Sequence, residues 1–501
     1  MLSSTRTVTF LGLLVQVTGL VRTILIANAL GVSLDFDSYN LALIAPTFFG
    51  TVLSSWLQVG FTGRYAGLVA NGENHLAGSY LTRMIIVVIG LSSGISLIFS
   101  IFPQQIMTLL LPSSETEMVN LAALALGLSG WILALNMTSD FLGLVLNCHG
   151  RFFAAAFAPA LNAALSVVAL WLWPKINLNA LVWTLLLGGL AQLVYIALMV
   201  GRLKLRYFFG GKQAASEVTR TVLLAIPILP AVMLANSAAS LVQLRAAELG
   251  EGAVSMFGYA TRLHSALSQV LVMGLGTVLL PHFAALWARG DKLGIVLVLR
   301  RLVRVGVLVT AVLAAGVWSM GGEAVEFLFG RGAFGRQQAV DVAHIWFTLS
   351  LALFPFALGT FVAKLFQAMR HATAILASGV ISFAVVVATT QIGLAEGRID
   401  YVAGAMVTST SVVMIFWLCW FERHFTARPL LSDLIKAVVL TLPVVFLMLL
   451  IDGFIVNCLL SLPVFVSLCV RGTAFLAVGA TVVYFFGLYR WFFSGNLSEP
   501  N

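Results

Sequence analysis

Two arginines lie deep inside apolar stretches of this sequence, Arg22 within 6–30 and Arg262 within 253–284. A charge at the centre of a bilayer costs roughly 2.5–3.5 kcal/mol on insertion scales, so such a residue normally faces a wet cavity or a partner. Because a guanidinium binds phosphate oxygens bidentately, two arginines facing one cavity would form an anion site. The alternative is that each pairs with an Asp or a backbone carbonyl, or extends its head group out of the membrane.

Asp37 and Gln16 are further candidates for a polar site. Asp37 begins the second apolar run, where it would pair with an arginine as part of a gate or cap its helix. Capping is the favoured interpretation, since Asp is common at helix starts. Gln16 interrupts the first apolar run and is a candidate for lining a cavity or a lipid groove.

Two more polar residues interrupt later apolar runs. Asp140, with Asn136 and Asn147, makes half of one run polar, which indicates a cavity lining or, by preference, an interhelical hydrogen bond. Arg471 lies deep in the final run with no acidic neighbour in sequence. It would touch a lipid head group or line a groove.

Residues typical of catalysis are not arranged for it. The seven His do not cluster, and neither HExxH nor GxxxxGK[ST] occurs. The four Cys are isolated in apolar runs, without metal-ligand or CxxC spacing. We therefore expect no enzyme, cofactor or metal site, and any energy would come from an ion gradient, the membrane potential or the gradient of the substrate.

The composition indicates an all-α polytopic membrane protein. Of 501 residues, 60% are hydrophobic and only 9% are charged, with a mean hydropathy of +1.03. Soluble proteins carry about 25% charged residues, which excludes soluble enzymes and nucleic-acid binders. Apolar runs long enough to span a bilayer predict fourteen helices, near 6–30, 38–63, 80–102, 118–146, 152–173, 179–201, 220–244, 253–284, 296–320, 342–367, 372–394, 401–421, 434–454 and 462–489.

Basic residues are distributed unequally between the connecting loops. With both termini in the cytoplasm, 20 of the 28 Lys and Arg lie on the cytoplasmic side, five lie outside and three lie within spans. This bias follows the positive-inside rule and predicts a multi-pass protein of the inner membrane. The net charge of +9 is therefore a topology signal and not a sign of nucleic-acid binding.

Short motifs recur at an offset of 218 or 219 residues. Asn71-Gly72-Glu73 matches Arg289-Gly290-Asp291, Ala29-Leu30-Gly31 matches Glu248-Leu249-Gly250, and Arg151 matches Arg370. An offset of six spans gives two copies of equal orientation, as in parallel transporter repeats. We predict two parallel six-helix lobes around a central cavity, 1–201 and 220–421, a cytoplasmic linker 202–219, and two additional helices in 434–489.

At these residues the chain resembles the MurJ (MviN) family of lipid II flippases, in the multidrug/oligosaccharidyl-lipid/polysaccharide exporter superfamily. The resemblance implies fourteen spans, two lobes, a cationic central cavity and a groove for a lipid tail formed by the last two spans. It carries over Arg22, Asp37 and Arg262 as substrate-binding residues. The motifs that carry it are Gly19-Leu20-Val21-Arg22, Ala29-Leu30-Gly31 through Asp37, Pro46, Gly150-Arg151-Phe152, Ala156-Phe157-Ala158-Pro159, Tyr259-Ala260-Thr261-Arg262-Leu263, Gly274-Leu275-Gly276-Thr277-Val278-Leu279-Leu280-Pro281 and Phe329-Gly330-Arg331-Gly332-Ala333-Phe334.

Several charged positions of the family are replaced in this chain. Val15-Gln16 stands for Ser-Arg, and Thr261 and Ser265 stand where acidic residues flank the family's arginine. We expect the chain to be a flippase for a polyprenyl-diphosphate-linked saccharide, lipid II or a related glycan precursor. Its expected partners are this substrate and the membrane lipids. The alternatives are a cation-coupled drug or metabolite exporter, for which Asp140 would be the coupling carboxylate, and a non-transporting membrane scaffold.

Overall fold

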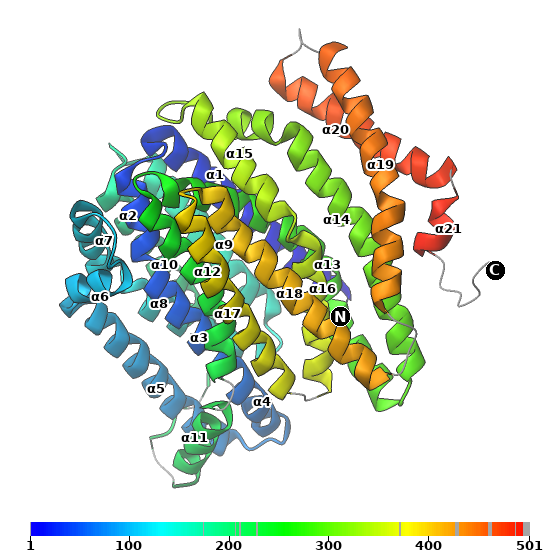
Figure 1. Cartoon of the computed structure of the whole chain (residues 1–501). Coiled ribbons are helices and arrows are strands. Elements are labelled where there is room, and N and C mark those ends of the chain that lie inside the picture. Colours follow the sequence, from blue (N-terminus) through cyan, green and yellow to red (C-terminus); the bar gives the residue numbers. More distant parts are fainter. Residues whose placement is uncertain are drawn as a thin grey trace. The chain divides into compact units, whose positions relative to one another are not determined.

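Apolar segments of this chain form helices because a backbone in hydrocarbon must satisfy its N–H and C=O groups within the segment. The computed structural model describes residues 2–173, 175–205, 207–209, 212–226, 229–369, 372–425, 430–458, 463–485 and 487–493. Over these ranges the chain is helical almost throughout and contains no strand. The predicted all-α membrane fold is thereby confirmed. The chain divides into two compact units, Met1–Ser255 and Met256–Asn501 (Figure 1).

The first unit is built around α8, α9 and α10. Helix α9 packs on both α1 and α10, and α8 packs on α10 and α5. The ring of Phe61 stacks on those of Tyr65 and Tyr80 and packs at a tilt against Phe141, in a buried core where α4, α5 and α8 meet. The helices of this unit are α1 (Leu2–Leu30), α2 (Leu34–Ala42), α3 (Ile44–Gly60), α4 (Thr62–Ala70), α5 (Asn74–Ile101), α6 (Pro103–Leu110), α7 (Thr116–Ser129), α8 (Ile132–Cys148), α9 (Phe152–Trp171), α10 (Leu178–Gly201), α11 (Lys212–Ala225), α12 (Leu229–Ala246) and the short η2 (Ala247–Leu249).

In the second unit, α14 packs along α15 and α19, and α17 packs along α18. One core surrounds Phe366 and Trp417, and a separate core surrounds Met448 and Phe475 where α14, α19 and α20 meet. The helices are α13 (Ala253–Ala288), which begins in the last residues of the first unit, α14 (Lys292–Phe329), α15 (Arg336–Ser350), α16 (Leu353–Ala368), α17 (Ala372–Ala395), α18 (Ile399–Phe425), α19 (Leu430–Cys458), α20 (Val464–Phe485) and α21 (Leu488–Phe493).

The turn after α4 and the turn after α13 have the same backbone geometry. Gly72 and Gly290 both adopt a positive φ, of 74° and 68°, which glycine tolerates without strain. The four backbone hydrogen bonds of residues 67–74 recur in residues 285–292, each displaced by 218 positions. This is the offset of the sequence repeat, and of its other two matches the pair Arg151 and Arg370 includes a residue, Arg370, that lies outside the described residues. The division into two six-helix lobes with a linker stays a prediction.

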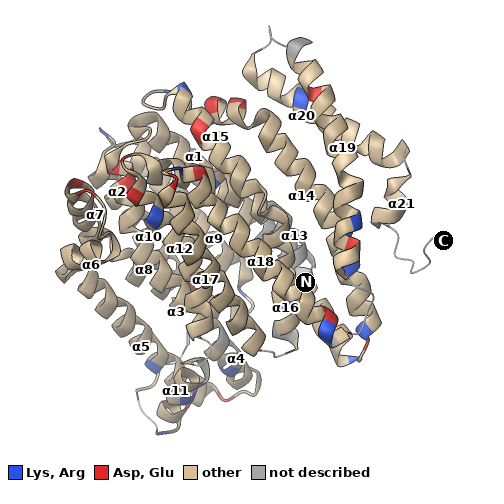
Figure 2. Cartoon of the chain, viewed as in Figure 1, with Lys and Arg blue, Asp and Glu red and all other residues tan. Residues whose placement is uncertain are grey.

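Every predicted span overlaps a described helix or pair of helices. Among the described residues, ten helical segments are long and apolar enough to cross a membrane, or up to eleven if the bent pair α15 and α16 is one span. The count of fourteen is compatible with this result and stays a prediction. Charged residues gather mostly near helix ends and connecting turns, and most of the helical length carries none (Figure 2).

Candidate functional site

Arg22 is held on α1 by residues of two other helices. Its Nη2 donates to the hydroxyl of Tyr39 on α2 at 2.8 Å and to the carbonyl of Leu181 on α10 at 3.5 Å. The guanidinium carbon lies 5.7 Å from the centre of the Tyr39 ring. Its Nε is buried and has no hydrogen-bond partner. Since no carboxylate of the described residues forms an ion pair with it, the positive charge of Arg22 is not neutralised there.

Asp37 binds the amino end of a helix far away in sequence. Its buried carboxylate accepts hydrogen bonds from the backbone N–H of Gly252 at 2.5 Å and of Ser255 at 2.6 Å, and from the Ser255 hydroxyl. Its own helix α2 is capped instead by Ser33, whose hydroxyl accepts from Phe36 N. Asp37 therefore caps α13, where a carboxylate satisfies free N–H groups and favours the helix dipole.

Gln16, Asp140 and Arg262, three further residues predicted for a polar site, lie on three different helices. Gln16 is half-buried on α1. Asp140 lies on α8 at a cavity of about 410 Å³ and accepts a hydrogen bond from Ser54 at 3.0 Å. Arg262 is exposed on α13 in the second unit, whereas Arg22 belongs to the first. The meeting of these two arginines in one cavity stays a prediction.

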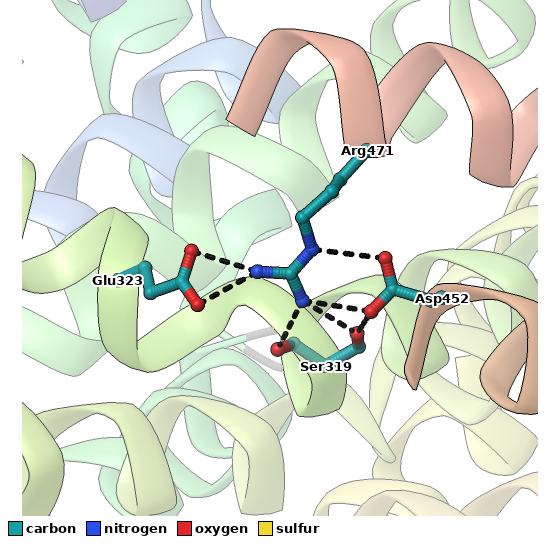
Figure 3. A network of polar contacts seen from close by, with 4 residues as sticks. All are labelled: Ser319, Glu323, Asp452 and Arg471. Atoms are coloured by element: carbon teal, nitrogen blue, oxygen red, sulfur yellow. Dashed lines mark hydrogen bonds and ion pairs between the residues drawn. The ribbon is translucent and has the colours of Figure 1, made fainter. Parts of the chain in front are cut away.

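Arg471 is buried between two carboxylates. Its Nε and Nη2 donate to the two oxygens of Asp452 at 3.0 and 2.7 Å, and its Nη1 lies 2.7 Å from both oxygens of Glu323. Ser319 adds its carbonyl at 3.2 Å and donates its hydroxyl to Asp452. The guanidinium reaches from α20 between α14 and α19 (Figure 3). We call these four residues the Arg471 network.

A second ion cluster joins α14 and α19 towards their amino ends, away from the Arg471 network, which lies towards their carboxyl ends. Asp433, in the first turn of α19, lies 2.7 Å from Nη2 of Arg304 and 3.2 Å from Nε of Arg300. Arg304 also donates to the carbonyl of Trp491 on α21 at 3.3 Å, and its guanidinium carbon lies 4.5 Å from the centre of a Trp491 ring. We call these four residues the Asp433 cluster. In the sequence, Arg300 and Arg304 belong to the basic residues of the predicted cytoplasmic side, and nothing there indicates their partners.

An apolar cavity of about 490 Å³ lies between α14, α15 and α19. Its lining on α14 extends from Val307 to Trp318, which lies between Arg304 of the Asp433 cluster and Ser319 of the Arg471 network. The 15 residue steps from Arg304 to Ser319 span about 22 Å at 1.5 Å per residue. On α19 the lining from Val438 to Leu449 likewise lies between Asp433 and Asp452. The cavity is thus bounded at both ends by ion pairs.

Comparison with protein families gives one match over most of the sequence. The family model described as Lipid II flippase MurJ matches residues 26–470. The chain belongs to the lipid II flippase MurJ family. The members of this family are transporters and not enzymes, and the many apolar helices make this chain a multi-pass membrane protein.

Curated relatives carry the same description at low identity. The chain is 25% identical over 360 residues to a probable lipid II flippase MurJ of Rhizobium meliloti (strain 1021), covering 69% of this chain and 65% of the relative. It is 26% identical over 361 residues to the lipid II flippase MurJ of Burkholderia cenocepacia, covering 69% of each. The chain thus spans about two thirds of the length of these MurJ proteins.

Solved structures show that the fold is shared with MurJ and with a wider superfamily. A lipid II flippase MurJ in an inward closed conformation superimposes with a TM-score of 0.77 at 16% identity, covering 96% of this chain and 99% of that one. An inward-facing multidrug resistance MATE transporter of the MOP superfamily gives a TM-score of 0.70 at 15% identity, covering 82% and 94%. At these identities the likeness concerns the fold alone.

Proposed function

We propose that this chain flips a polyprenyl-diphosphate-linked saccharide, lipid II or a related glycan precursor, across the inner membrane by alternating access, with both termini in the cytoplasm. Membership of the MurJ family supports the class of substrate. The observation that carries the proposal within the molecule is the state of Arg22. Its charge has no carboxylate partner among the described residues, and its Nε is buried without an acceptor.

Arg22 is suited to a phosphate because its position is already fixed. Tyr39 holds one amino group, so the guanidinium is oriented before a ligand arrives. The Nε and the other amino group remain for phosphate oxygens, which a guanidinium binds in parallel pairs. In this proposal Arg262 contributes a second guanidinium to the diphosphate, and Asp37 acts by capping the helix that carries Arg262.

The apolar cavity of the second unit is suited to the lipid tail of the proposed substrate. Its lining consists of aliphatic and aromatic side chains of α14, α15 and α19, with Thr441 as the one hydroxyl of the described lining. Such a surface between membrane helices suits a hydrocarbon chain, since the Thr441 hydroxyl holds the one side-chain oxygen of the described lining that the chain would leave unpaired. We assign the polyprenyl tail to it.

Complementation of a strain depleted of its lipid II flippase tests this function. We expect the parent chain to restore growth and Arg22→Ala to fail, with Arg22→Lys intermediate because an ammonium lacks the bidentate fork. Arg336→Ala is the matched control, since the Arg336 side chain is 85% exposed. Equal membrane levels of the variants are verified by immunoblot.

Two results would redirect the proposal. Failure of the parent to rescue growth, together with accumulation of a different lipid-linked sugar in the deletion strain, would assign a related glycan. Rescue by Arg22→Ala as good as by the parent would remove Arg22 from the substrate site.

A further inference from the structure

The polar cavity of the first unit is not part of the phosphate site proposed at Arg22. It occupies about 410 Å³ between α3, α8, α9 and α10. Since one water takes about 30 Å³ in the liquid, this volume exceeds that of a single bare ion and admits a partly hydrated one. Its polar lining consists of Ser54, Gln58, Ser139, Asp140, Asn147 and Gln192.

Asp140 is the acidic member of this lining, and its charge is not compensated by the protein. Its carboxylate accepts one hydrogen bond, from the hydroxyl of Ser54. Within the ranges that the structure describes, no Lys, Arg or His forms an ion pair with it. A carboxylate in a membrane-spanning segment normally has a cationic partner, because hydrocarbon does not solvate its charge.

Further polar side chains lie on the same face of α8 as Asp140 and on α10 across the cavity. Asn136 and Asn147 stand four residues before and seven residues after it, a spacing that places all three side chains on one side of a helix. The Oδ1 of Asn136 is buried and has no hydrogen-bond partner. On α10, the Oε1 of Gln192 is fixed by a hydrogen bond of 2.8 Å from Asn162.

We propose that this cavity binds a monovalent cation, Na⁺ or a proton, at the carboxylate of Asp140. Either cation neutralises the uncompensated negative charge. Carboxylate, carboxamide and hydroxyl oxygens are the ligands that hard cations prefer, and the lining supplies all three kinds. The described residues contain no group of three His, Cys, Asp or Glu side chains that would hold a transition metal.

Cation binding at Asp140 would give the transporter a coupling ion, which the positively charged phosphate site would not bind. Occupancy would follow the ion concentration on whichever side the cavity opens, so an ion gradient could bias the two states of alternating access. Because the cation is tested without any lipid substrate, failure of the flippase proposal would leave this one standing, and the reverse also holds.

Thermal unfolding of the purified full-length chain in detergent tests the site. NaCl is exchanged for choline chloride at constant ionic strength and fixed pH, and in a second arm pH is varied in choline chloride alone. A ligand that binds only the folded protein raises the unfolding midpoint with its concentration. We expect a saturable rise with Na⁺, or with falling pH if the occupant is a proton, which Asp140→Asn abolishes and Glu117→Gln, an exposed acidic control of the same unit, retains.

Ser54→Ala keeps the carboxylate and therefore serves if Asp140→Asn does not fold. Because the hydrogen bond from Ser54 stabilises the ionised carboxylate, its loss is expected to shift the apparent cation affinity, which for a proton rises by up to about tenfold. No dependence of the parent on either Na⁺ or pH would overturn the proposal. So would an equal dependence in the parent and in Asp140→Asn, because the cation would then bind elsewhere.

Discussion

Arg471 and Asp452 face each other in α20 and α19, joined by two hydrogen bonds of 3.0 and 2.7 Å. Their side chains are 2% and 4% exposed, so this is a buried ion pair. Glu323 and Ser319 bind the same guanidinium from α14. The Arg471 network therefore links α19 and α20 to α14.

Removal of the Arg471 charge should strongly destabilise the second unit. Arg471→Met leaves the buried carboxylate of Asp452 without its partner, a change that costs about 3–5 kcal/mol for a buried pair. Asp452→Asn should cost less, because Glu323 still neutralises the arginine. Unfolding midpoints in detergent measure both, with Arg336→Met as the exposed control. The prediction is wrong if Arg471→Met is as stable as that control.

Arg304 and Trp491 should be energetically coupled in the Asp433 cluster. Their cation–π contact, with 4.5 Å between guanidinium carbon and ring centre, is expected to contribute about 0.5–2 kcal/mol. A double-mutant cycle of Arg304→Gln and Trp491→Leu measures it directly. The same cycle with Arg336→Gln should be additive, since Arg336 pairs with Glu326 instead. Additivity in the first cycle would argue against the contact.

Loss of the Asp37 carboxylate should loosen the start of α13. Asp37→Ala removes the acceptor of two backbone N–H groups, and a lost cap costs about 0.5–2 kcal/mol. Asp37→Asn retains one acceptor oxygen and should fall between the parent and the alanine variant. Hydrogen exchange of a peptide over 252–258 reports the effect, and Asp35→Ala, two residues earlier on α2, is the control. Similar exchange in both alanine variants would contradict the capping role.

The sequence predicted the helices better than the contacts between polar residues. Apolar runs determine the helices locally, so each predicted span overlaps a helix of the structure. The partners of Asp37 lie 215 and 218 residues away, and Glu323 lies 148 residues from Arg471. Such pairs depend on tertiary packing, which no spacing in a single sequence reveals. The runs of Arg22 and Arg471 both lack an acidic residue, yet only Arg471 has carboxylate partners among the described residues, so the run alone does not predict which arginine is paired.

Filling the apolar cavity should weaken the hold on a lipid tail and leave the fold intact. Ala311 lines this cavity on α14, and Ala311→Phe would place a ring in space that the proposed polyprenyl chain occupies. Added apolar volume in an open cavity creates no buried polar group, so the unfolding midpoint should stay near that of the parent.

Native mass spectrometry with a polyprenyl phosphate measures the bound fraction, which we expect to fall severalfold. Val309→Phe is the matched control and should bind as the parent does, because Val309 is an exposed apolar residue of the same helix that is absent from the described cavity lining. If Ala311→Phe retains the lipid as well as Val309→Phe, the tail occupies another surface, and the cavity bounded by the two ion clusters has a different occupant.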